Sequence, residues 1–345
     1  MPVVRLNPGT SDEIAPLGSF SSCHNRKAVP LVLGGGMVRM REFDLISWLR
    51  ARTPSNPRIT IGLGDDCAAL LPPQRELLVT TDLLMDGTDF RLSEVGPRRA
   101  GRKAMAANLS DIAAMAAVPI AAVVSVALPR LPSPFAQELM LGLREVADEF
   151  AVPIVGGDTN GWEGPLVISV TVLGEATERG PVPRSGAKPG DWIFVTGPLG
   201  GSILGHHLDF QPRVREALAL HAAFDLHALI DISDGLAADL NHILEMSNCG
   251  AVLQADQIPI APAAWELSRT TGQPALQHAL ADGEDFELIF TVSPADGERL
   301  LHTPPVPGLV KIGTCVESGL WLETNGQRER LDPLGWVHEI EKDPS

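Results

Sequence analysis

The chain has 345 residues, of which 44% are hydrophobic and 20% charged, so it can form the cores of two domains. Asp and Glu outnumber Lys and Arg by 43 to 27, which gives a formal net charge of −16. Such a charge repels phosphate backbones and anionic lipid, so we expect no nucleic-acid partner and no membrane partner. No run of about 18 uninterrupted apolar residues is present, so we expect no transmembrane helix.

The cysteines indicate the cellular compartment of the protein, and the first residues indicate whether the N-terminus is ordered. Cys23, Cys67, Cys249 and Cys315 lie far apart and form no C-x-x-C pair. This usage predicts neither a zinc site nor a disulfide scaffold, and it favours the reducing cytoplasm. Residues 1–38 are rich in Pro, Gly, Ser and Asn and show no hydrophobic period, so they predict a disordered tail.

The first predicted domain spans residues 39–178. Its periodicity predicts helices at 41–51 and 97–117, a helix from Pro134 to about Phe150 with Ser133 as its cap, and strands at 76–82, 121–128, 152–155 and 166–173.

The second predicted domain spans residues 185–340, after a segment rich in Gly, Pro and basic residues at 178–190 that predicts a boundary. Within it we expect strands at 191–196, 228–232 and 286–292, and a helix through about Met246 that is capped by Ser233 or Asp234. Helices and strands alternate in both halves, which predicts a two-domain α/β (α+β) fold.

Acidic residues recur in short clusters flanked by Gly, Ser or Thr. These clusters lie at residues 64–66, 80–82, 108–111, 156–159, 231–235 and 283–285. Carboxylate and hydroxyl oxygens suit Mg²⁺, and glycine lets the backbone approach a phosphate. Taken singly, each cluster is more typical of a helix cap or a tight turn than of a ligand site.

Two carboxylates are stronger candidates than the rest. Asp231 follows an apolar strand, and α/β proteins bind ligands at the carboxyl ends of strands. Asp111 lies inside a predicted helix on the same face as Asn108, among Ala and Met residues. A buried carboxylate is costly unless it binds something, so Asp111 indicates a ligand.

Other motifs leave two interpretations open. The Gly-rich loop 197–205 is typical either of a phosphate cradle or of a tight turn, and no Gly-Lys-Ser/Thr follows to make it a Walker A motif. Arg184 is either a phosphate clamp or a solvated charge. The chain has no G-x-S-x-G elbow, so serine-hydrolase chemistry is not supported.

The motifs in order are more specific than any one of them. IGLGDDCAALL, LLVTTDLLMDGTDF, KAMAANLSDIAAMAAVP, IVGGDTN, PRSGAKPGDWIFVTGPLG, DISDGLAADLNHIL and GEDFELIFTV resemble the motifs of thiamine-monophosphate kinases, over roughly residues 41–336. That family belongs to the superfamily of aminoimidazole-ribotide synthetase, selenophosphate synthetase and a hydrogenase-maturation protein.

The resemblance implies a fold and a reaction. It implies two α/β domains, the N-terminal one pairing through its sheet with a second copy into a homodimer, and ATP bound between domains and across the dimer. The γ-phosphoryl group of ATP would pass directly onto thiamine monophosphate, giving thiamine diphosphate and ADP with the help of several Mg²⁺ ions.

The resemblance also assigns residues. The Mg²⁺ positions are Asp66, Thr80 (where Ser is usual), Thr81, Asp82, Asp111, Asp158, Asp231 and Asp234. The ATP contacts are Gly157, Asp158, Arg184 and Ser233, and the substrate contacts are Asp89, Glu284 and Trp336.

The sequence departs from the family at two places. Asp89 precedes Phe90 where the family has a His that contacts the substrate, and the chain between Gly205 and Pro212 is shorter than usual. The first departure concerns recognition of the acceptor, and the second the local shape of the C-terminal domain.

A metal-assisted transfer needs alignment and charge neutralisation rather than covalent catalysis. Because a phosphate monoester is itself nucleophilic, we expect no catalytic His or Cys. Two alternatives stay open: a sister ATP-dependent enzyme with another small acceptor, and a catalytically silent nucleotide-binding homologue.

Overall fold

The computed structural model describes residues 42–53, 56–131 and 134–336. The predicted tail at 1–38 lies outside the described residues, as does the predicted cap Ser133. The described part forms a two-stranded, a four-stranded and a seven-stranded sheet. None of its helices is both long and apolar enough to cross a membrane.

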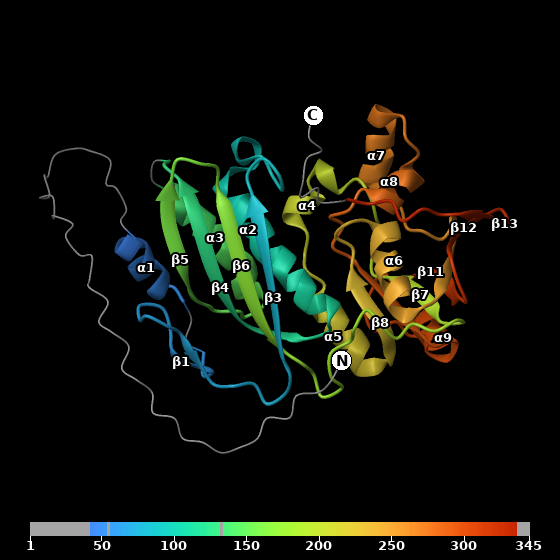
Figure 1. Ribbon diagram of the computed structural model, residues 1–345, viewed down its shortest axis with the longest axis horizontal. Coiled ribbons are helices and arrows are strands. Elements are labelled where there is room, and N and C mark those ends of the chain that lie inside the picture. The colour runs from blue at the N-terminus through green and yellow to red at the C-terminus, as the bar shows by residue number, and fades with distance from the viewer. Residues whose placement is uncertain (1–41, 54–55, 132–133, 337–345) are drawn as a thin grey trace, which may run out of the picture. The chain divides into compact units, whose positions relative to one another are not determined.

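The N-terminal half is built around the four-stranded sheet. Its elements are α1 (Glu42–Arg50), β1 (Ile59–Ile61), β2 (Ala69–Leu70), β3 (Leu77–Met85), α2 (Leu92–Ala114), β4 (Val118–Pro129), α3 (Phe135–Glu149), β5 (Ile154–Trp162) and β6 (Val167–Glu175). The strands lie in the order β3-β6-β4-β5, and only β4 and β5 are parallel. The helices α2 and α3 cover one face of this sheet (Figure 1).

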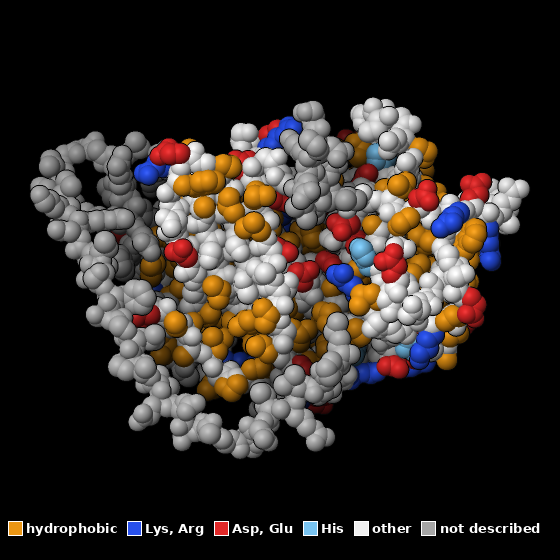
Figure 2. Space-filling view, viewed as in Figure 1, with side chains coloured by type: hydrophobic (Ala, Val, Ile, Leu, Met, Phe, Trp, Pro, Cys, Tyr) orange, Lys and Arg blue, Asp and Glu red, His pale blue; other side chains and the backbone are white. Residues whose placement is uncertain are grey.

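The alternation of side chains along β3 explains the two faces of the sheet. Leu84 is buried beneath the helices, whereas Leu77, Val79, Leu83 and Met85 point to the opposite face and are exposed. Figure 2 shows hydrophobic side chains spread over this open face of the sheet. An antiparallel sheet with one solvated face normally carries polar residues there, so this face is unusually apolar.

Two glycines allow α2 and α3 to pack closely. A Cβ on Gly101 would lie 2.3 Å from the carbonyl oxygen of Leu139, and a Cβ on Gly142 would lie 1.8 Å from the carbonyl oxygen of Arg98. Both helices therefore need glycine at the crossing, because any side chain there would meet backbone rather than a flexible group.

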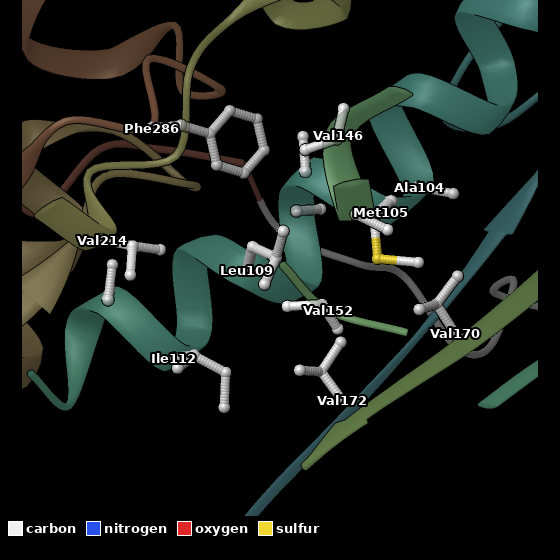
Figure 3. Close-up of a cluster of buried hydrophobic side chains, with 14 of the residues drawn as sticks. Ala104, Met105, Leu109, Ile112, Val146, Val152, Val170, Val172, Val214 and Phe286 are labelled. Atoms are coloured by element: carbon white, nitrogen blue, oxygen red, sulfur yellow. The ribbon is translucent and has the colours of Figure 1, made fainter. Parts of the chain in front are cut away.

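The buried core is continuous through α2. In Figure 3, Met105 of α2 lies toward Val170 of β6, while Val214 and Phe286 from the C-terminal half lie on the other side of the same helix. Leu109 is also fully buried in this cluster. One helix therefore supports both halves of the described chain.

The C-terminal half is built around the seven-stranded sheet. Its elements are β7 (Trp192–Val195), η1 (Ser202–Leu204), α4 (His206–Asp209), α5 (Val214–Ala223), β8 (Leu226–Asp231), α6 (Leu236–Ser247), β9 (Gly250–Gln254), α7 (Pro262–Thr271), α8 (Ala275–Ala281), β10 (Leu288–Val292), α9 (Pro294–His302), β11 (Val310–Val316), β12 (Leu320–Thr324) and β13 (Gln327–Arg330). The strand order is β13-β12-β9-β11-β7-β10-β8, with β9 and β12 parallel. Mixed sheets with helices confirm the predicted α/β class.

The predicted caps were wrong in detail. Pro134 is the residue before α3 rather than its first residue, and it makes no side-chain cap bond. Helix α6 follows Gly235, and neither Ser233 nor Asp234 caps it with a side chain. The carboxylate of Asp239 accepts hydrogen bonds from the backbone N–H groups of Asp234 and Gly235 instead. The Ser233 and Asp234 side chains are thus not used by the helix.

Candidate active site

A cavity of about 1020 Å³ is lined by residues of β3, α2, η1, α4, the end of β8 and the loop before β10. Its lining includes eight of the predicted site residues: Asp82, Asp89, Asp111, Asp231, Ser233, Asp234, Glu284 and Trp336. Residues from both halves of the chain thus meet in one cavity, of a size that suits a small-molecule ligand.

Hydrogen bonds from hydroxyl groups orient two carboxylates in the cavity. The Ser110 hydroxyl on α2 donates to Oδ2 of Asp231 at 2.6 Å, and both residues are buried. The Thr80 hydroxyl on β3 donates to Oδ2 of Asp111 on α2. Helix α2 therefore holds one carboxylate from β8 and presents another of its own.

The predicted pair of Asn108 and Asp111 also has a structural basis. Asn108 is fully buried, its side-chain oxygen accepts a hydrogen bond from the backbone N–H of Asp82 at 3.1 Å, and its amide donates to the carbonyl of Ala104. This contact fixes β3 against α2 at the point where the Asp82 side chain enters the cavity.

Three carboxylates of the cavity hold protons unusually tightly. Burial, and then the charge of Asp231, raises the pKa of Asp82 to about 6. Burial and the neighbouring Asp82 raise the pKa of Asp111 to about 6, and burial and Asp111 raise the pKa of Asp231 to about 7. Arg184 acts in the opposite direction on the pKa of both Asp111 and Asp231. Buried carboxylates that also repel one another are stabilised in their charged form by a bound cation.

A further acidic group adjoins this cluster. Ligand atoms of Asp234, Asp239 and His242 all lie within 4.8 Å of one another. Burial raises the pKa of Asp239 to about 8, and the charge of Asp231 adds to that effect. Sequence reasoning missed Asp239, and its only signal was its position in the first turn of α6 after a strand end.

Three of the residues predicted to bind Mg²⁺ lie outside the cavity. Thr81 lies on the open face of the four-stranded sheet, where its hydroxyl donates to the carbonyl of Val170 and accepts from Thr171. Asp158 lies opposite Ser125 in β4, on that same open face. Asp66 is exposed in the loop between β1 and β2. The structure therefore does not bring these three residues into the cavity.

The remaining predicted nucleotide contacts also lie outside the cavity lining. Gly157 has a φ of +151°, and a Cβ there would lie 1.7 Å from the carbonyl oxygen of Val124 in β4. Arg184 is exposed, and its charge reaches the carboxylates of Asp111 and Asp231.

A buried lysine of the cavity links two predicted substrate residues. Lys103 is 1% exposed, and its Nζ donates to Oε1 of Glu284 at 2.6 Å and to the carbonyl of Asp89 at 2.7 Å. The Asp89 carboxylate accepts from the backbone N–H of Met85 at 2.7 Å. The Asp89 side chain thus closes its own turn, although the residue lines the cavity.

Gly335 and Trp336, the last described residues, also lie beside the cavity. The backbone N–H of Trp336 donates to the carbonyl of Asp234 at 2.9 Å, and the residue is 57% exposed and lines the cavity. A Cβ on Gly335 would lie 2.5 Å from the same carbonyl oxygen. Only glycine at 335 lets the chain pass this close to the Asp234 carbonyl, and this close passage places Trp336 at the cavity.

The Gly-rich loop proves to be a tight turn. The N–H of Gly200 donates to Asp285 at 2.8 Å, and the N–H of Gly201 donates to Asp282 at 2.9 Å. Carboxylates of this chain therefore occupy the amides that a phosphate cradle would use. Of the two interpretations, the structure favours the turn.

The fold and the cavity agree with comparisons to known proteins. Residues 64–176 match the AIR synthase related protein N-terminal domain, and residues 188–319 match the corresponding C-terminal domain. These two domains define the chain as an AIR synthase related protein.

Relatives identify the family within that class. The chain is 42% identical to a thiamine-monophosphate kinase of Rhodopirellula baltica, over 86% of this chain and 97% of the relative. It is 36% identical to the Escherichia coli (strain K12) thiamine-monophosphate kinase, over 73% of this chain and 82% of that one. The chain belongs to the thiamine-monophosphate kinase family, which confirms the prediction from the motifs.

Solved structures agree. A thiamine-monophosphate kinase from Stenotrophomonas maltophilia matches with a TM-score of 0.71 and 34% identity, covering 82% of this chain and 96% of that one. The structure of AaThiL complexed with AMPPCP and TMP matches with a TM-score of 0.68 and 28% identity, covering 88% and 100%. Hydrogenase maturation protein HypE of E. coli shares the fold, with a TM-score of 0.69 at 22% identity.

Proposed function

We propose that this protein converts thiamine monophosphate to thiamine diphosphate by direct, Mg²⁺-dependent phosphoryl transfer from ATP. The observation that carries the proposal is one cavity lined by two kinds of residue. Its lining includes the carboxylates of Asp82, Asp111 and Asp231, and it also includes Glu284 and Trp336. Its family members bear the name of this activity, and AaThiL has been solved with AMPPCP and TMP.

The carboxylates of Asp82, Asp111 and Asp231 fit Mg²⁺. Their donor atoms are all oxygens, and burial first, then the charges of neighbouring carboxylates, raise the pKa values of all three. Asp82, Asp111 and Asp231 would hold the first ions, and Asp234 would extend the set. When bound, Mg²⁺ supplies the charge neutralisation that lets two anionic phosphates approach.

The chain's own residues then provide alignment. Ser110 and Thr80 fix the directions of two carboxylates through their hydroxyl groups. Lys103 fixes Glu284, and the indole of Trp336 offers an aromatic face to the cationic thiazolium ring of the substrate. No step requires a side chain to act as a covalent nucleophile, because the acceptor phosphate is the nucleophile.

The residues on the open face of the sheet belong to a second part of the proposal. Thr81 and Asp158 face away from the cavity, on a surface where Val79 is 60% exposed. We assign this face to pairing with a second copy of the chain, so that Thr81, Asp158 and Asp66 serve a nucleotide site completed across the homodimer. The division into domains 39–178 and 185–340, and a cytoplasmic location, belong to the same proposal.

Light scattering tests the pairing. The wild-type chain is expected at the mass of a dimer, and Val79→Asp is expected to shift it toward the monomer because a charge on this face opposes burial. Glu163→Ala, at an exposed residue, is the matched control. A monomeric wild type contradicts the pairing without affecting the cavity.

One incubation tests the reaction. Purified protein with Mg²⁺, ATP and thiamine monophosphate is expected to yield thiamine diphosphate and ADP in equal amounts by mass spectrometry, and a chelator is expected to stop the reaction. ATP consumption without thiamine diphosphate would point to a sister enzyme with another acceptor. ATP binding without turnover, over a panel of acceptors, would point to a silent homologue.

A further inference from the structure

One imidazole in the cavity has no role in the reaction as described. His207 lies in the short helix α4, which follows Gly205. It is only 7% exposed, and it lines the same cavity as Lys103 and Glu284. Its electrostatic environment includes those two residues and Arg99.

The hydrogen bond of His207 determines its tautomer. Nδ1 lies 2.8 Å from the carbonyl oxygen of Ser202, and because a carbonyl can only accept, Nδ1 carries the proton. Burial lowers the pKa of the imidazole, which keeps the ring neutral. Nε2 therefore presents a lone pair, and it has no hydrogen-bond partner among the described residues.

The neighbouring polar groups show what this lone pair can bind. Two of the three N–H groups of Lys103 are used by Glu284 and the carbonyl of Asp89. The N–H of Met85 uses Oδ2 of Asp89, and Lys103 uses Oε1 of Glu284, which leaves Asp89 Oδ1 and Glu284 Oε2. With His207 Nε2, this region of the cavity therefore offers three acceptors against one N–H of Lys103, so acceptors outnumber donors and a donor on the ligand is favoured.

We propose that His207 is a specificity-determining residue that accepts a hydrogen bond through Nε2 from the amino group on the pyrimidine ring of the acceptor substrate. The inference rests on the proposed function, since thiamine monophosphate carries one such neutral amino donor. An analogue in which a carbonyl oxygen replaces this amino group would set two acceptors against each other. Such a site therefore rejects the oxo analogue more strongly than a shape match alone would.

Paired substitutions separate recognition from structure. His207→Asn keeps a donor near the position of Nδ1, and so the bond to Ser202, but it removes the acceptor at Nε2. His207→Gln places an amide oxygen near the position of Nε2. His206→Gln is the matched control, because His206 is anchored through Nε2 to the carbonyl of Asp285 and does not line the cavity.

Calorimetry in the presence of Mg²⁺ and AMPPCP measures binding without turnover. We expect His207→Asn to weaken binding of thiamine monophosphate about 10-fold, the loss of one hydrogen bond. We expect the same variant to bind the oxo analogue more tightly than wild type does, because the acceptor that opposes its carbonyl oxygen is gone. We expect His207→Gln and His206→Gln to stay within about 3-fold of wild type. Thermal melts check folding, and His207→Phe replaces the Asn variant if that one does not fold.

A folded His207→Asn protein that binds thiamine monophosphate as wild type does, with the same preference over the oxo analogue, would overturn the inference. Wild type that binds thiamine monophosphate but forms no thiamine diphosphate would contradict the proposed function alone. Wild type that does not bind it would overturn both.

Discussion

The hydroxyl of Ser110 on α2 donates a 2.6 Å hydrogen bond to the carboxylate of Asp231 at the end of β8. A residue of the helix that covers one sheet thus orients the carboxylate at the end of a strand in the other sheet. Because both residues are buried, this contact is protected from water, and its loss leaves a polar group without a partner.

The carboxylates of Asp111 and Asp231 give the first prediction. Asp231→Asn keeps an oxygen to accept from Ser110 but removes the charge, so turnover is expected to fall at least about 100-fold because charge neutralisation is lost. Asp111→Asn is expected to act in the same direction. Steady-state kinetics over a range of Mg²⁺ concentrations measure both.

Asp225→Asn is the control for those variants. Asp225 is exposed and pairs with Arg179 at 3.5 Å, outside the cavity lining. If Asp111→Asn and Asp231→Asn leave turnover and Mg²⁺ dependence unchanged, the assignment of these carboxylates to metal binding is wrong.

Protons and Mg²⁺ are expected to compete for the carboxylates of the cavity. The folded-state pKa values of Asp82, Asp111 and Asp231 are raised to about 6, 6 and 7, so the folded protein binds these protons more tightly than the unfolded chain does. Without metal, their stability contribution is full below a pH of about 4 and is lost as the pH rises through about 7. We therefore expect Mg²⁺ to raise the melting temperature more at about pH 8 than at about pH 5.

Thermal melts of the metal-free and Mg²⁺-loaded protein check this. Asp231→Asn is the informative comparison, because it removes one of the titrating groups and should reduce the difference between the two pH values. An equal effect of Mg²⁺ at both values would contradict the argument.

Gly335 is expected to act on substrate binding through Trp336. Gly335→Ala places a methyl group 2.5 Å from the Asp234 carbonyl, which pushes the segment and its indole away from the cavity. The KM for thiamine monophosphate should rise about 10-fold while the KM for ATP stays near wild type. Leu334→Ala, at an exposed neighbour, is the control, and equal KM values in the two variants would refute the positioning role.

The crossing of α2 and α3 is expected to tolerate no side chain. Gly142→Ala sets a Cβ 1.8 Å from the Arg98 carbonyl, so the helices must separate, and the free energy of unfolding should fall by about 2 to 4 kcal/mol. Gly161→Ala is the control, because a Cβ there meets nothing within 4 Å. Urea unfolding of the two variants measures the difference, and similar midpoints would show that the crossing can relax.

Local patterns predicted much of the fold and two of the carboxylates that line the cavity. The apolar run before Asp231 indicated a strand end, and the helical spacing of Asn108 and Asp111 indicated a common face, as the structure has them. The family motifs named Thr80, Thr81 and Asp82 together. However, consecutive strand residues alternate between faces, so Thr81 lies opposite its two neighbours.

Contacts between distant segments could not be read from the chain. The role of Gly335 depends on a carbonyl about a hundred residues earlier, and the tautomer of His207 depends on a turn whose amides are held by Asp282 and Asp285. The cap of α6 was missed because the Asp239 carboxylate, inside the helix, accepts from the backbone N–H groups of Asp234 and Gly235 that precede it. From the sequence alone, the Ser233 side chain was an equally good candidate for capping this helix.

The straight run of α2 also sets a length. Lys103, Ala107 and Asp111 all line the cavity, and eight residues of α-helix span about 12 Å. In the proposed function, Asp111 acts on the phosphates and Lys103 fixes Glu284, which contacts the rings. The spacing of Lys103 and Asp111 along α2 would then set the distance that a ligand must keep between its rings and its phosphate, and thiamine, which lacks the phosphate, would reach only one of the two.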